Sequence, residues 1–320
     1  MDGLTQPELF QGQEEAAEMG LKAGTPKPGP VRSSQGRRSD IRLFHADFPG
    51  TAAEFVEDRS VDVVVTSPPY NIGIKYSQYR DNLKPEAYLE WCDTWAVEIS
   101  RCLAEKGSFF LNIGCRPRDP WMPWEIAQVF RRHFKLQNVI HWIKSISISR
   151  ADVGNYPGIT QDVTVGHYKP INSDRFVNDQ HEYLFHLTHD GEVNLDRLAI
   201  GVPYQDPSNI NRWKSAEGGL HCRGNTWFTP YPTINYRAKD RPHPATFPVM
   251  LPERCFRLHG LQSIHRVMDP FIGLGTTAIA AAGLGLDCIG FDIDRAYLNV
   301  AQQALSDLPC RVNLKEAIRI

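Results

Sequence analysis

The chain has 320 residues, of which 42% are hydrophobic and 22% charged, with a formal net charge of −2 at pH 7. This length predicts one large α/β domain with room for an insertion. No apolar run approaches the roughly 20 residues of a membrane helix, and the N-terminus lacks a signal-peptide core, so we expect no membrane partner. The seven cysteines are odd in number and never spaced C-x-x-C, which argues against disulfides and zinc and predicts a cytoplasmic location without a metal.

Along the chain, residues 1–38 are rich in Gln, Glu, Gly, Pro and Ser, which predicts a disordered leader. From Ile41 onward, apolar runs alternate with helical patterns. We expect strands over 41–46, 61–66, 107–113, 137–144, 182–188, 264–268 and 286–292. We expect helices over 50–57, 85–104, 122–133, 248–259, 276–284 and 295–306. This alternation predicts a seven-stranded α/β sheet covered on both faces, with one antiparallel strand because no helix pattern separates the fourth strand from the fifth.

Two segments, 145–180 and 190–242, do not fit this alternation. Both are long and rich in Gly, Pro, Asn and aromatic residues, and long irregular segments in compact domains are commonly functional. We expect 39–189 and 243–310 to form two halves of one domain. Segment 190–242 is then an inserted recognition region, and 311–320 is a C-terminal tail.

The sequence Thr66-Ser67-Pro68-Pro69-Tyr70 directly follows a buried strand. A Pro-Pro pair cannot continue a sheet, because proline lacks the ladder donor and fixes φ, so carbonyls at this strand end are left free. Such a site suits a flat group with an exocyclic amine. The amine would donate to Ser67 and to the Pro68 carbonyl while Tyr70 stacks on the ring. A rigid structural turn is the alternative.

A second motif, Asp269-Pro-Phe-Ile-Gly273-Leu-Gly275-Thr276, links a strand to an Ala-rich helix. A Gly-x-Gly turn between strand and helix lets a ligand approach the backbone closely. An acid beside the glycines would repel a pyrophosphate but suits an ammonium or sulfonium group, both of which S-adenosylmethionine carries. Asp292, at the end of the next strand, can bind a ribose diol. A dinucleotide site and a purely structural turn are the alternatives.

Asp47 ends the first strand in the way that Asp292 ends the last one. If strands 264–268, 286–292 and 41–46 are neighbours, Asp47 can accept a hydrogen bond from an adenine amino group. Phe271 would pack against the adenine ring. The alternative for Asp47 is a helix N-cap before 50–57.

These motifs resemble those of S-adenosylmethionine-dependent DNA amino-methyltransferases over roughly residues 40–308. The catalytic motif precedes the cofactor motif, which resembles the circularly permuted β-group order with a TSPPY catalytic motif. The resemblance implies a Rossmann-like methyltransferase sheet, an S-adenosyl-L-methionine cofactor and double-stranded DNA as partner. Residues 243–248 resemble the motif that holds the methionine end of the cofactor, and His181-Glu182-Tyr183 looks like the start of the seventh strand. The implied site residues are Ser67, Pro68, Pro69 and Tyr70 for catalysis, and Asp47, Thr66, Thr246, Asp269, Phe271, Gly273, Gly275, Thr276 and Asp292 for the cofactor.

An exocyclic amine is a poor nucleophile because its lone pair is delocalised into the ring. Donating both hydrogens, to Ser67 and to the Pro68 carbonyl, draws the nitrogen toward sp³ geometry, so that it can attack the sulfonium methyl in line. Carbon-5 methylation would instead need a cysteine nucleophile, typically after a proline. Cys310 alone follows a proline, and it lies far from the catalytic motif in the sequence.

Family members acting on cytosine N4 mostly carry Ser at the Ser67 position, whereas those acting on adenine N6 mostly carry Asp or Asn. A neutral hydroxyl can also serve the neighbouring ring nitrogen of cytosine, which would repel a carboxylate. We therefore expect N4-methylcytosine, with adenine N6 as the alternative. An RNA methyltransferase and an inactive cofactor-binding regulator are remoter alternatives, disfavoured by the motif order and by the intact motifs.

Basic residues crowd part of segment 190–242 among aromatic ones, despite the slightly acidic chain. We expect Arg212, Lys214, Arg223 and Arg237 to bind DNA, with 145–180 closing on it. A solvated loop region with some buried aromatic residues is the alternative. The resemblance is compatible with a cognate restriction endonuclease as a second partner, in the nucleoid-containing cytoplasm of a prokaryotic cell.

Overall fold

The computed structural model describes residues 38–317 except 75, 77, 115–117, 157, 167–172, 207, 209, 211–218 and 231–245. Its centre is a nine-stranded sheet in the order β10-β4-β7-β3-β2-β11-β12-β1-β13. These strands are β1 (Ser39–His45), β2 (Val61–Thr66), β3 (Leu103–Ile113), β4 (Lys135–Ile143), β7 (His181–Thr188), β10 (Thr226–Phe228), β11 (Arg266–Asp269), β12 (Asp287–Asp292) and β13 (Cys310–Glu316). Two short pairs lie outside the sheet: β5 (Ile146–Ile148) with β6 (Val163–Val165), and β8 (Val202–Pro203) with β9 (Leu220–His221).

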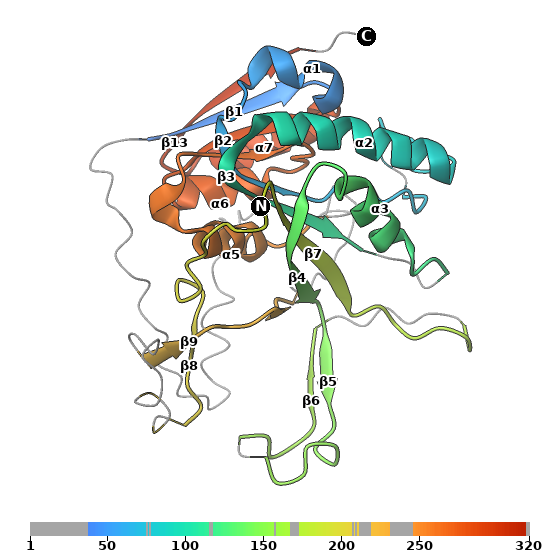
Figure 1. The fold of residues 1–320 in the computed structure, drawn as a ribbon, viewed down its shortest axis with the longest axis vertical. Helices are drawn as coiled ribbons and strands as arrows, with labels where there is room; N and C mark the ends of the chain where they lie inside the picture. The colour runs from blue at the N-terminus through green and yellow to red at the C-terminus, as the bar shows by residue number, and fades with distance from the viewer. Residues whose placement is uncertain are drawn as a thin grey trace, which may run out of the picture.

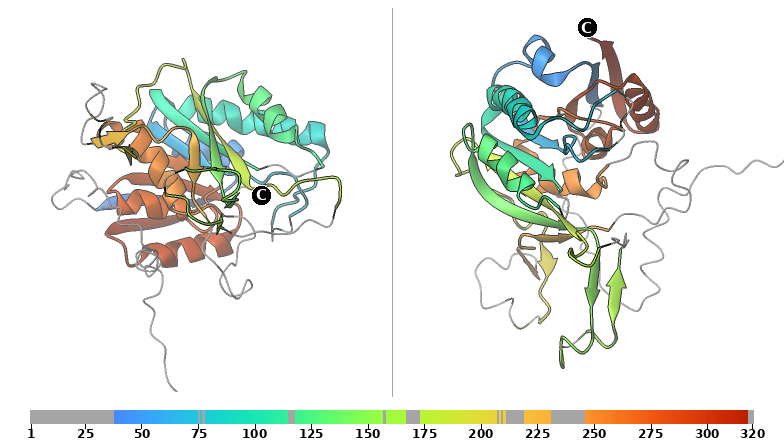
Figure 2. Two further views of the ribbon diagram at one scale, coloured as in Figure 1. Left: turned by 90° about the horizontal axis from the view of Figure 1, so that it is seen from below. Right: turned by 90° about the vertical axis from the view of Figure 1, so that its right-hand side faces the viewer.

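Helices cover both faces of the sheet, as Figures 1 and 2 show. One face packs on α1 (Phe48–Phe55), α2 (Pro85–Cys102) and α3 (Met122–Phe130), and the other on α5 (Met250–His259), α6 (Thr276–Gly283) and α7 (Arg295–Leu305). Strand β2 supplies both cores because successive side chains point to opposite faces. Val64 packs into the first core, and Val63 and Val65 pack into the second. Val61 also packs into the first core, because the pairing of β2 with β3 is irregular between Val61 and Val63. All six predicted helices and the two-sided cover are confirmed.

The prediction of seven strands is wrong, because β10 and β13 extend the predicted sheet at its two edges. Strand β13 pairs in parallel with β1, so residues 311–316 are not a tail. Its side chains are partly or fully exposed, and it therefore carries no apolar run that sequence reasoning could detect. Strand β10 has three residues and lies inside the segment predicted for recognition. The predicted antiparallel strand is confirmed, since β7 runs antiparallel to both β3 and β4.

The carboxyl ends of β1, β12, β11 and β2 meet at one edge of the sheet because these neighbouring strands are parallel. This order confirms that the strands preceding Asp47, Asp269 and Asp292 are neighbours. Antiparallel β7 begins at this edge, so Glu182 also lies there. Strand β4 ends at the same edge, and the β5–β6 hairpin projects beyond it (Figure 1). Segment 145–180 is thus not wholly irregular.

Among the described residues, no helix is both long and apolar enough to cross a membrane.

Candidate active site

A cleft lies at this edge and brings the two predicted motifs together. Of the predicted residues, those that line it are Ser67, Pro68, Pro69, Tyr70, Asp47, Thr246, Asp269, Phe271, Gly273, Thr276 and Asp292. Motifs separated by about 200 residues in the sequence therefore form one site.

Asp269 anchors the turn between β11 and α6. Its side chain is 1% exposed, and its two oxygens accept hydrogen bonds from the hydroxyls of Thr66 (2.6 Å) and Thr277 (2.6 Å). The Phe271 backbone N–H also donates to it, at 3.0 Å. Burial raises the pKa of Asp269 to about 6, against these three hydrogen bonds, which favour the charged form. Asp269 thus shapes the turn and places a carboxylate beside the cleft.

Asp292 holds the tip of the glycine turn. One carboxylate oxygen accepts from the Gly273 backbone N–H at 2.9 Å, and the other accepts from the Asp294 N–H at 2.8 Å. Burial raises the pKa of this carboxyl to about 6, and the negative charges of Asp294 and Asp269 contribute to the rise. A largely buried carboxylate with a raised pKa gains from a ligand that donates hydrogen bonds or carries positive charge.

Asp47 follows β1 and is the N-cap residue of α1. It occupies this position without a regular side-chain capping hydrogen bond, and it lines the cleft. Burial raises its pKa, and a hydrogen bond from the Gly50 backbone partly offsets the rise. The site therefore presents acids from three adjacent strand ends.

Two predicted cofactor residues stand behind the cleft. Thr66 is fully buried and donates to Asp269, so it acts on the site through that carboxylate. Gly275 adopts φ +84°, and a Cβ there would come within 2.7 Å of the Ala301 Cβ. Its role is to allow α6 to pack closely against α7.

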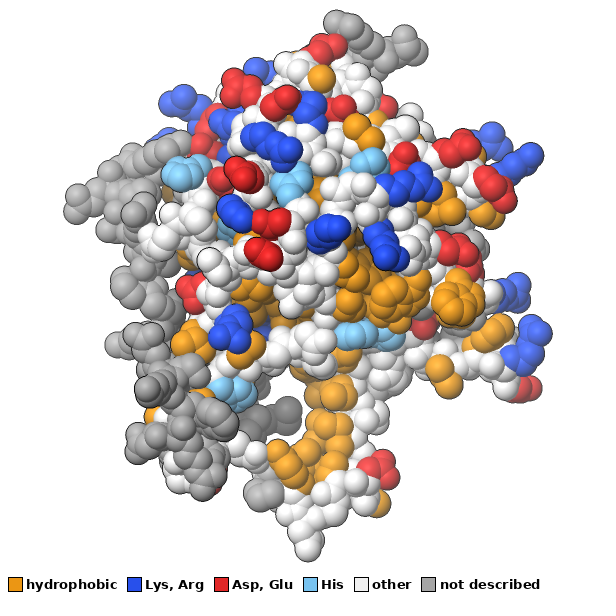
Figure 3. Space-filling model, viewed as in Figure 1, with side chains coloured by type: hydrophobic (Ala, Val, Ile, Leu, Met, Phe, Trp, Pro, Cys, Tyr) orange, Lys and Arg blue, Asp and Glu red, His pale blue; other side chains and the backbone are white. Residues whose placement is uncertain are grey.

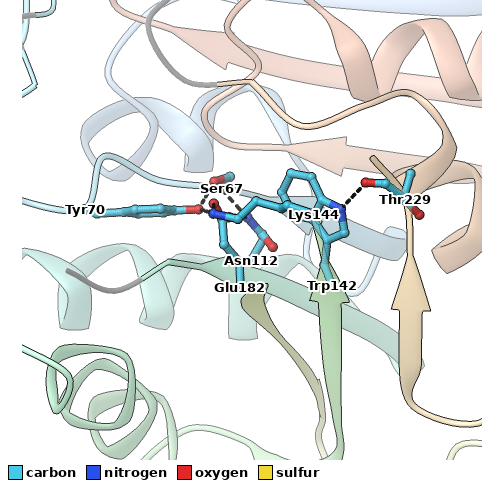
Figure 4. A network of polar contacts seen from close by, with 7 residues as sticks. All are labelled: Ser67, Tyr70, Asn112, Trp142, Lys144, Glu182 and Thr229. Atoms are coloured by element: carbon cyan, nitrogen blue, oxygen red, sulfur yellow. Dashed lines mark hydrogen bonds and ion pairs between the residues drawn. The ribbon is translucent and has the colours of Figure 1, made fainter. Parts of the chain in front are cut away.

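The predicted catalytic motif ends in a polar network (Figure 4). The Ser67 hydroxyl contacts the Tyr70 hydroxyl at 2.7 Å, and Tyr70 donates to Glu182 Oε2 at 3.0 Å. Asn112 donates to the Tyr70 oxygen at 2.8 Å and to Glu182 Oε2 at 2.6 Å. Lys144 pairs with Glu182 Oε1 at 3.1 Å. The Tyr70 ring is therefore fixed at its hydroxyl end, and the residue is 9% exposed.

The Pro-Pro turn and the loop behind it are also held in place. The Tyr88 hydroxyl donates to the Pro69 carbonyl at 2.7 Å. Pro68, which precedes this anchored residue, lines the cleft. Asp81, which is 3% exposed, accepts from the backbone N–H groups of Asn71 and Ile74 at 2.7 and 2.8 Å. These hydrogen bonds of Asp81 hold the segment that contributes Tyr76 and Tyr79 to the cleft.

Of the four predicted DNA-binding residues, the structure describes Arg223 alone. Arg212, Lys214 and Arg237 lie outside the described residues. Arg223 is half-buried, and its Nε donates to the Ile200 carbonyl at 2.9 Å. In the described part of the chain, no cluster of three or more His, Cys, Asp or Glu side chains is placed to hold a metal ion.

Comparison with known proteins identifies this arrangement. A profile of the DNA methylase family matches residues 61–303. The chain belongs to the N6/N4 DNA methylase family. The Type II methyltransferase M.HpaI of Haemophilus parainfluenzae is 27% identical over 258 residues, which cover 79% of this chain and 71% of the relative. The DNA adenine methyltransferase YhdJ of Escherichia coli K12 is 24% identical over 265 residues, covering 82% and 81%.

Two solved structures share the fold of this DNA methylase. PvuII DNA methyltransferase, described as cytosine-N4-specific, superposes with a TM-score of 0.56 at 17% identity, over 85% of this chain and 90% of that chain. The DNA modification methylase TTHA0409 of Thermus thermophilus, in complex with S-adenosyl-L-methionine, superposes with a TM-score of 0.55 at 23% identity, over 87% and 100%.

The chain is thus a DNA methyltransferase, and S-adenosyl-L-methionine is its cofactor. The cleft fits such a group, because buried acids at adjacent strand ends suit a cationic ligand that carries hydroxyl and amino donors. When bound, this cofactor supplies an electrophilic methyl group on its sulfonium.

Sequence reasoning missed several residues of the methylase site. Asn112 and Glu182 join the catalytic motif from β3 and β7. Their signal was a polar side chain near one end of a strand and next to apolar residues: Asn112 between Leu111 and Ile113, and Glu182 before Tyr183. Further cleft residues gave no recognisable pattern in the sequence: Phe48, Tyr76, Gln78, Tyr79, Trp91, Asp294 and Tyr297.

Proposed function

We propose that this DNA methylase is a site-specific Type II enzyme that methylates the exocyclic N4 amine of cytosine in duplex DNA. The observation that carries the proposal is the shared cleft, in which Ser67, Pro68 and Tyr70 face the acids of the cofactor motif. The flipped base would stack on Tyr70 and donate its amine hydrogens to the Ser67 hydroxyl and the Pro68 carbonyl. The nitrogen lone pair would then point at the sulfonium methyl of the cofactor. An N–C bond would form as the S–C bond breaks, the amine would release one proton, and no covalent enzyme intermediate would form.

Within this proposal, the cofactor is held by the three strand-end acids. Asp292 would accept from the ribose hydroxyls and Asp47 from the adenine amino group, with Phe271 against the adenine face. Thr246 would contact the methionine end. The motif order supports a circularly permuted β-group enzyme of the TSPPY type, since the catalytic strand β2 precedes the cofactor strand β11 in the chain.

The choice of cytosine rests on Ser67, the residue type typical of N4-specific members, and adenine N6 is the alternative. The relatives include a protein named as an adenine methyltransferase, and the similar structures include one named as cytosine-N4-specific. A neutral hydroxyl suits the edge of cytosine, whose ring nitrogen carries a lone pair beside the amine. The identity of the methylated nucleoside decides between the two bases.

We propose that Arg223, the predicted DNA-binding residue that the structure describes, binds DNA together with Arg254, which the sequence analysis did not single out. Arg254 donates to the Phe228 carbonyl and the Thr229 hydroxyl, and Trp142 ties Thr229 to β4 (Figure 4). Burial lowers the pKa of Arg254 to about 10, and the positive charge of Arg223 contributes to this lowering. Two partly desolvated guanidinium groups that repel each other favour a nearby anion, which a DNA phosphate would supply.

The β5–β6 hairpin would approach DNA from the other side of β4. Figure 3 shows hydrophobic side chains along it, and Tyr156 and Val165 are 51% and 36% exposed. The hairpin would therefore meet DNA through apolar contacts more than through charge. A restriction endonuclease that cuts the same site is the partner expected of a Type II enzyme, and both would act on DNA in a prokaryotic cytoplasm.

Transfer of tritiated methyl groups to duplex DNA tests the proposal. The wild type should label DNA, and a Ser67→Ala, Tyr70→Ala double variant should not, while it still binds S-adenosyl-L-methionine in calorimetry. Ser60→Ala, at an exposed hydroxyl outside the cleft, is the control and should be fully active. Full labelling by the double variant would contradict the proposed catalytic motif.

Replacing Arg223 and Arg254 with Gln tests the DNA-binding surface. Each substitution should weaken DNA binding. Where a phosphate contact is lost, the slope of log K against log salt concentration should become less steep by about one. Cofactor affinity should stay constant. Unchanged DNA affinity in both variants would show that DNA lies elsewhere.

A further inference from the structure

Glu182 sits at the centre of the polar network in Figure 4, although it does not line the cleft. Its side chain is 12% exposed, and both oxygens have partners. Oε1 pairs with Lys144, and Oε2 accepts from Tyr70 and Asn112. A buried carboxylate is tolerated only when it is paired and hydrogen-bonded in this way. A carboxylate is thus maintained one hydrogen bond behind Tyr70.

The hydrogen bonds around Tyr70 have a fixed direction. The phenol has one hydrogen, and it goes to the carboxylate of Glu182. The Tyr70 oxygen also accepts from the Asn112 amide. In its 2.7 Å contact with Ser67, Tyr70 must therefore be the acceptor, and Ser67 must donate its hydrogen. The chain of donors runs from Ser67 to Tyr70 to Glu182.

We propose, on the basis of the proposed function, that Glu182 is a positioning residue that turns Ser67 into a pure hydrogen-bond acceptor. With its hydrogen engaged by Tyr70, the Ser67 oxygen presents only lone pairs to the target amine. An amine that must give up electron density to the methyl group needs an acceptor of this kind. Lys144 and Asn112 fix the position of Glu182, and Glu182 in turn fixes the orientation of the Tyr70 hydroxyl.

Steric contacts hold the same arrangement. A Cβ at Gly114 would come within 2.8 Å of the Tyr70 ring and 3.2 Å of the Glu182 carboxyl carbon. Ring and carboxylate therefore pack directly against the backbone after β3. The site is organised before the base arrives, so no hydroxyl has to reorient during the reaction.

This network changes the reason for expecting cytosine. A Ser67 hydroxyl that donates to Tyr70 cannot at the same time donate to the ring nitrogen of cytosine. What then distinguishes Ser67 from a carboxylate is its neutrality rather than its donor capacity. The acceptor role itself suits an exocyclic amine of either base, so the proposal holds for both.

A double-mutant cycle between Glu182→Gln and Tyr70→Phe tests this role. Glu182→Gln keeps the shape of the side chain but offers an amide donor to Tyr70, so kcat should fall about 10-fold or more, the value of a hydrogen bond to a charged group. KM for DNA and Kd for S-adenosyl-L-methionine should stay within about twofold. Because Glu182 acts through the Tyr70 hydroxyl, the double variant should be no less active than the less active of the two single variants.

Glu98→Gln is the matched control, since Glu98 is similarly buried and ion-paired with Arg101. It should leave kcat unchanged. Lys144→Met is a second route to the same effect if Glu182→Gln unfolds, and should lower kcat with unchanged cofactor affinity. Multiplicative losses in the cycle, or unchanged kcat in both Glu182→Gln and Lys144→Met, would overturn the proposal. A wild type that transfers no methyl groups to DNA would overturn the proposed function itself, and this proposal with it.

Discussion

Asp292→Asn should weaken cofactor binding while leaving the free protein at least as stable. Both oxygens of Asp292 accept backbone hydrogen bonds, from Gly273 and Asp294. Asparagine has one acceptor oxygen, so one of these two N–H groups loses its partner. The same substitution removes the charge and one acceptor from the cleft, where the ribose hydroxyls would bind.

The substitution should raise the stability of the free protein and lower its affinity for the cofactor. A pKa raised from 3.8 to about 6 means that the charged form of Asp292 is disfavoured at pH 7 by about 3 kcal/mol in the folded protein. Asparagine removes this cost and loses one hydrogen bond, at about 1–2 kcal/mol. The free protein should therefore gain about 1–2 kcal/mol, or a few degrees in Tm. Cofactor affinity should fall about 10- to 100-fold, the effect of losing a charged acceptor.

Thermal unfolding without cofactor and titration calorimetry with S-adenosyl-L-methionine measure the two effects. Asp287→Asn is the matched control, because Asp287 lies at the opposite end of β12 and accepts from the Asp40 backbone N–H at 2.9 Å. It should leave cofactor affinity unchanged. Wild-type affinity in Asp292→Asn, or a free protein destabilised by more than about 2 kcal/mol, would refute the reasoning.

Three further predictions concern the same cleft. Burial raises the pKa values of Asp269 and Asp292 to about 6, so protonation of these groups stabilises the free fold. This contribution to stability is full below pH 3.8 and is lost as the pH rises through 6. Cofactor binding needs the carboxylates, so calorimetry should show weaker binding at pH 5.5 than at pH 7.5. Gly275→Ala should lower the free energy of unfolding by about 2 kcal/mol or more, because Gly275 has a positive φ and a Cβ there would press on Ala301. Gly283→Ala at the end of α6 is the control: a Cβ there meets nothing within 4 Å, so it should be neutral or stabilising. Equal effects of the two substitutions on thermal unfolding would contradict this. Asp81→Ala should expose the loop around Asn71 to proteases and weaken cofactor binding, because the backbone N–H groups of Asn71 and Ile74 lose their acceptor. An unchanged rate of proteolytic cleavage would show that Asp81 does not hold this loop.

The sequence predicted the parts of the fold that carry a strong local pattern. The valine-rich run of β2 and the Gly-x-Gly turn after β11 identified both halves of the site, and the acids at three strand ends identified their common edge. Strand β13 escaped detection because it is an edge strand with exposed side chains. Strand β10 escaped because three residues show no periodicity.

The role of individual side chains depends on tertiary contacts that a motif does not show. Thr66 and Gly275 belong to the two motifs by position, yet they support the cleft from behind. Glu182 lies more than 100 residues from Tyr70 in the sequence, and only the antiparallel pairing of β7 with β3 brings them together. A single polar residue at the start of a strand could not be paired with its partner from the sequence.

The central claim is that this cleft transfers a methyl group to an exocyclic amine, and mass analysis of nucleosides tests it most directly. DNA incubated with the protein and S-adenosyl-L-methionine is digested to nucleosides, with a Ser67→Ala variant in parallel. We predict N4-methylcytosine in the wild-type digest and its loss in the variant. N6-methyladenine as the sole product would overturn the choice of base, and 5-methylcytosine would contradict direct transfer to an amine.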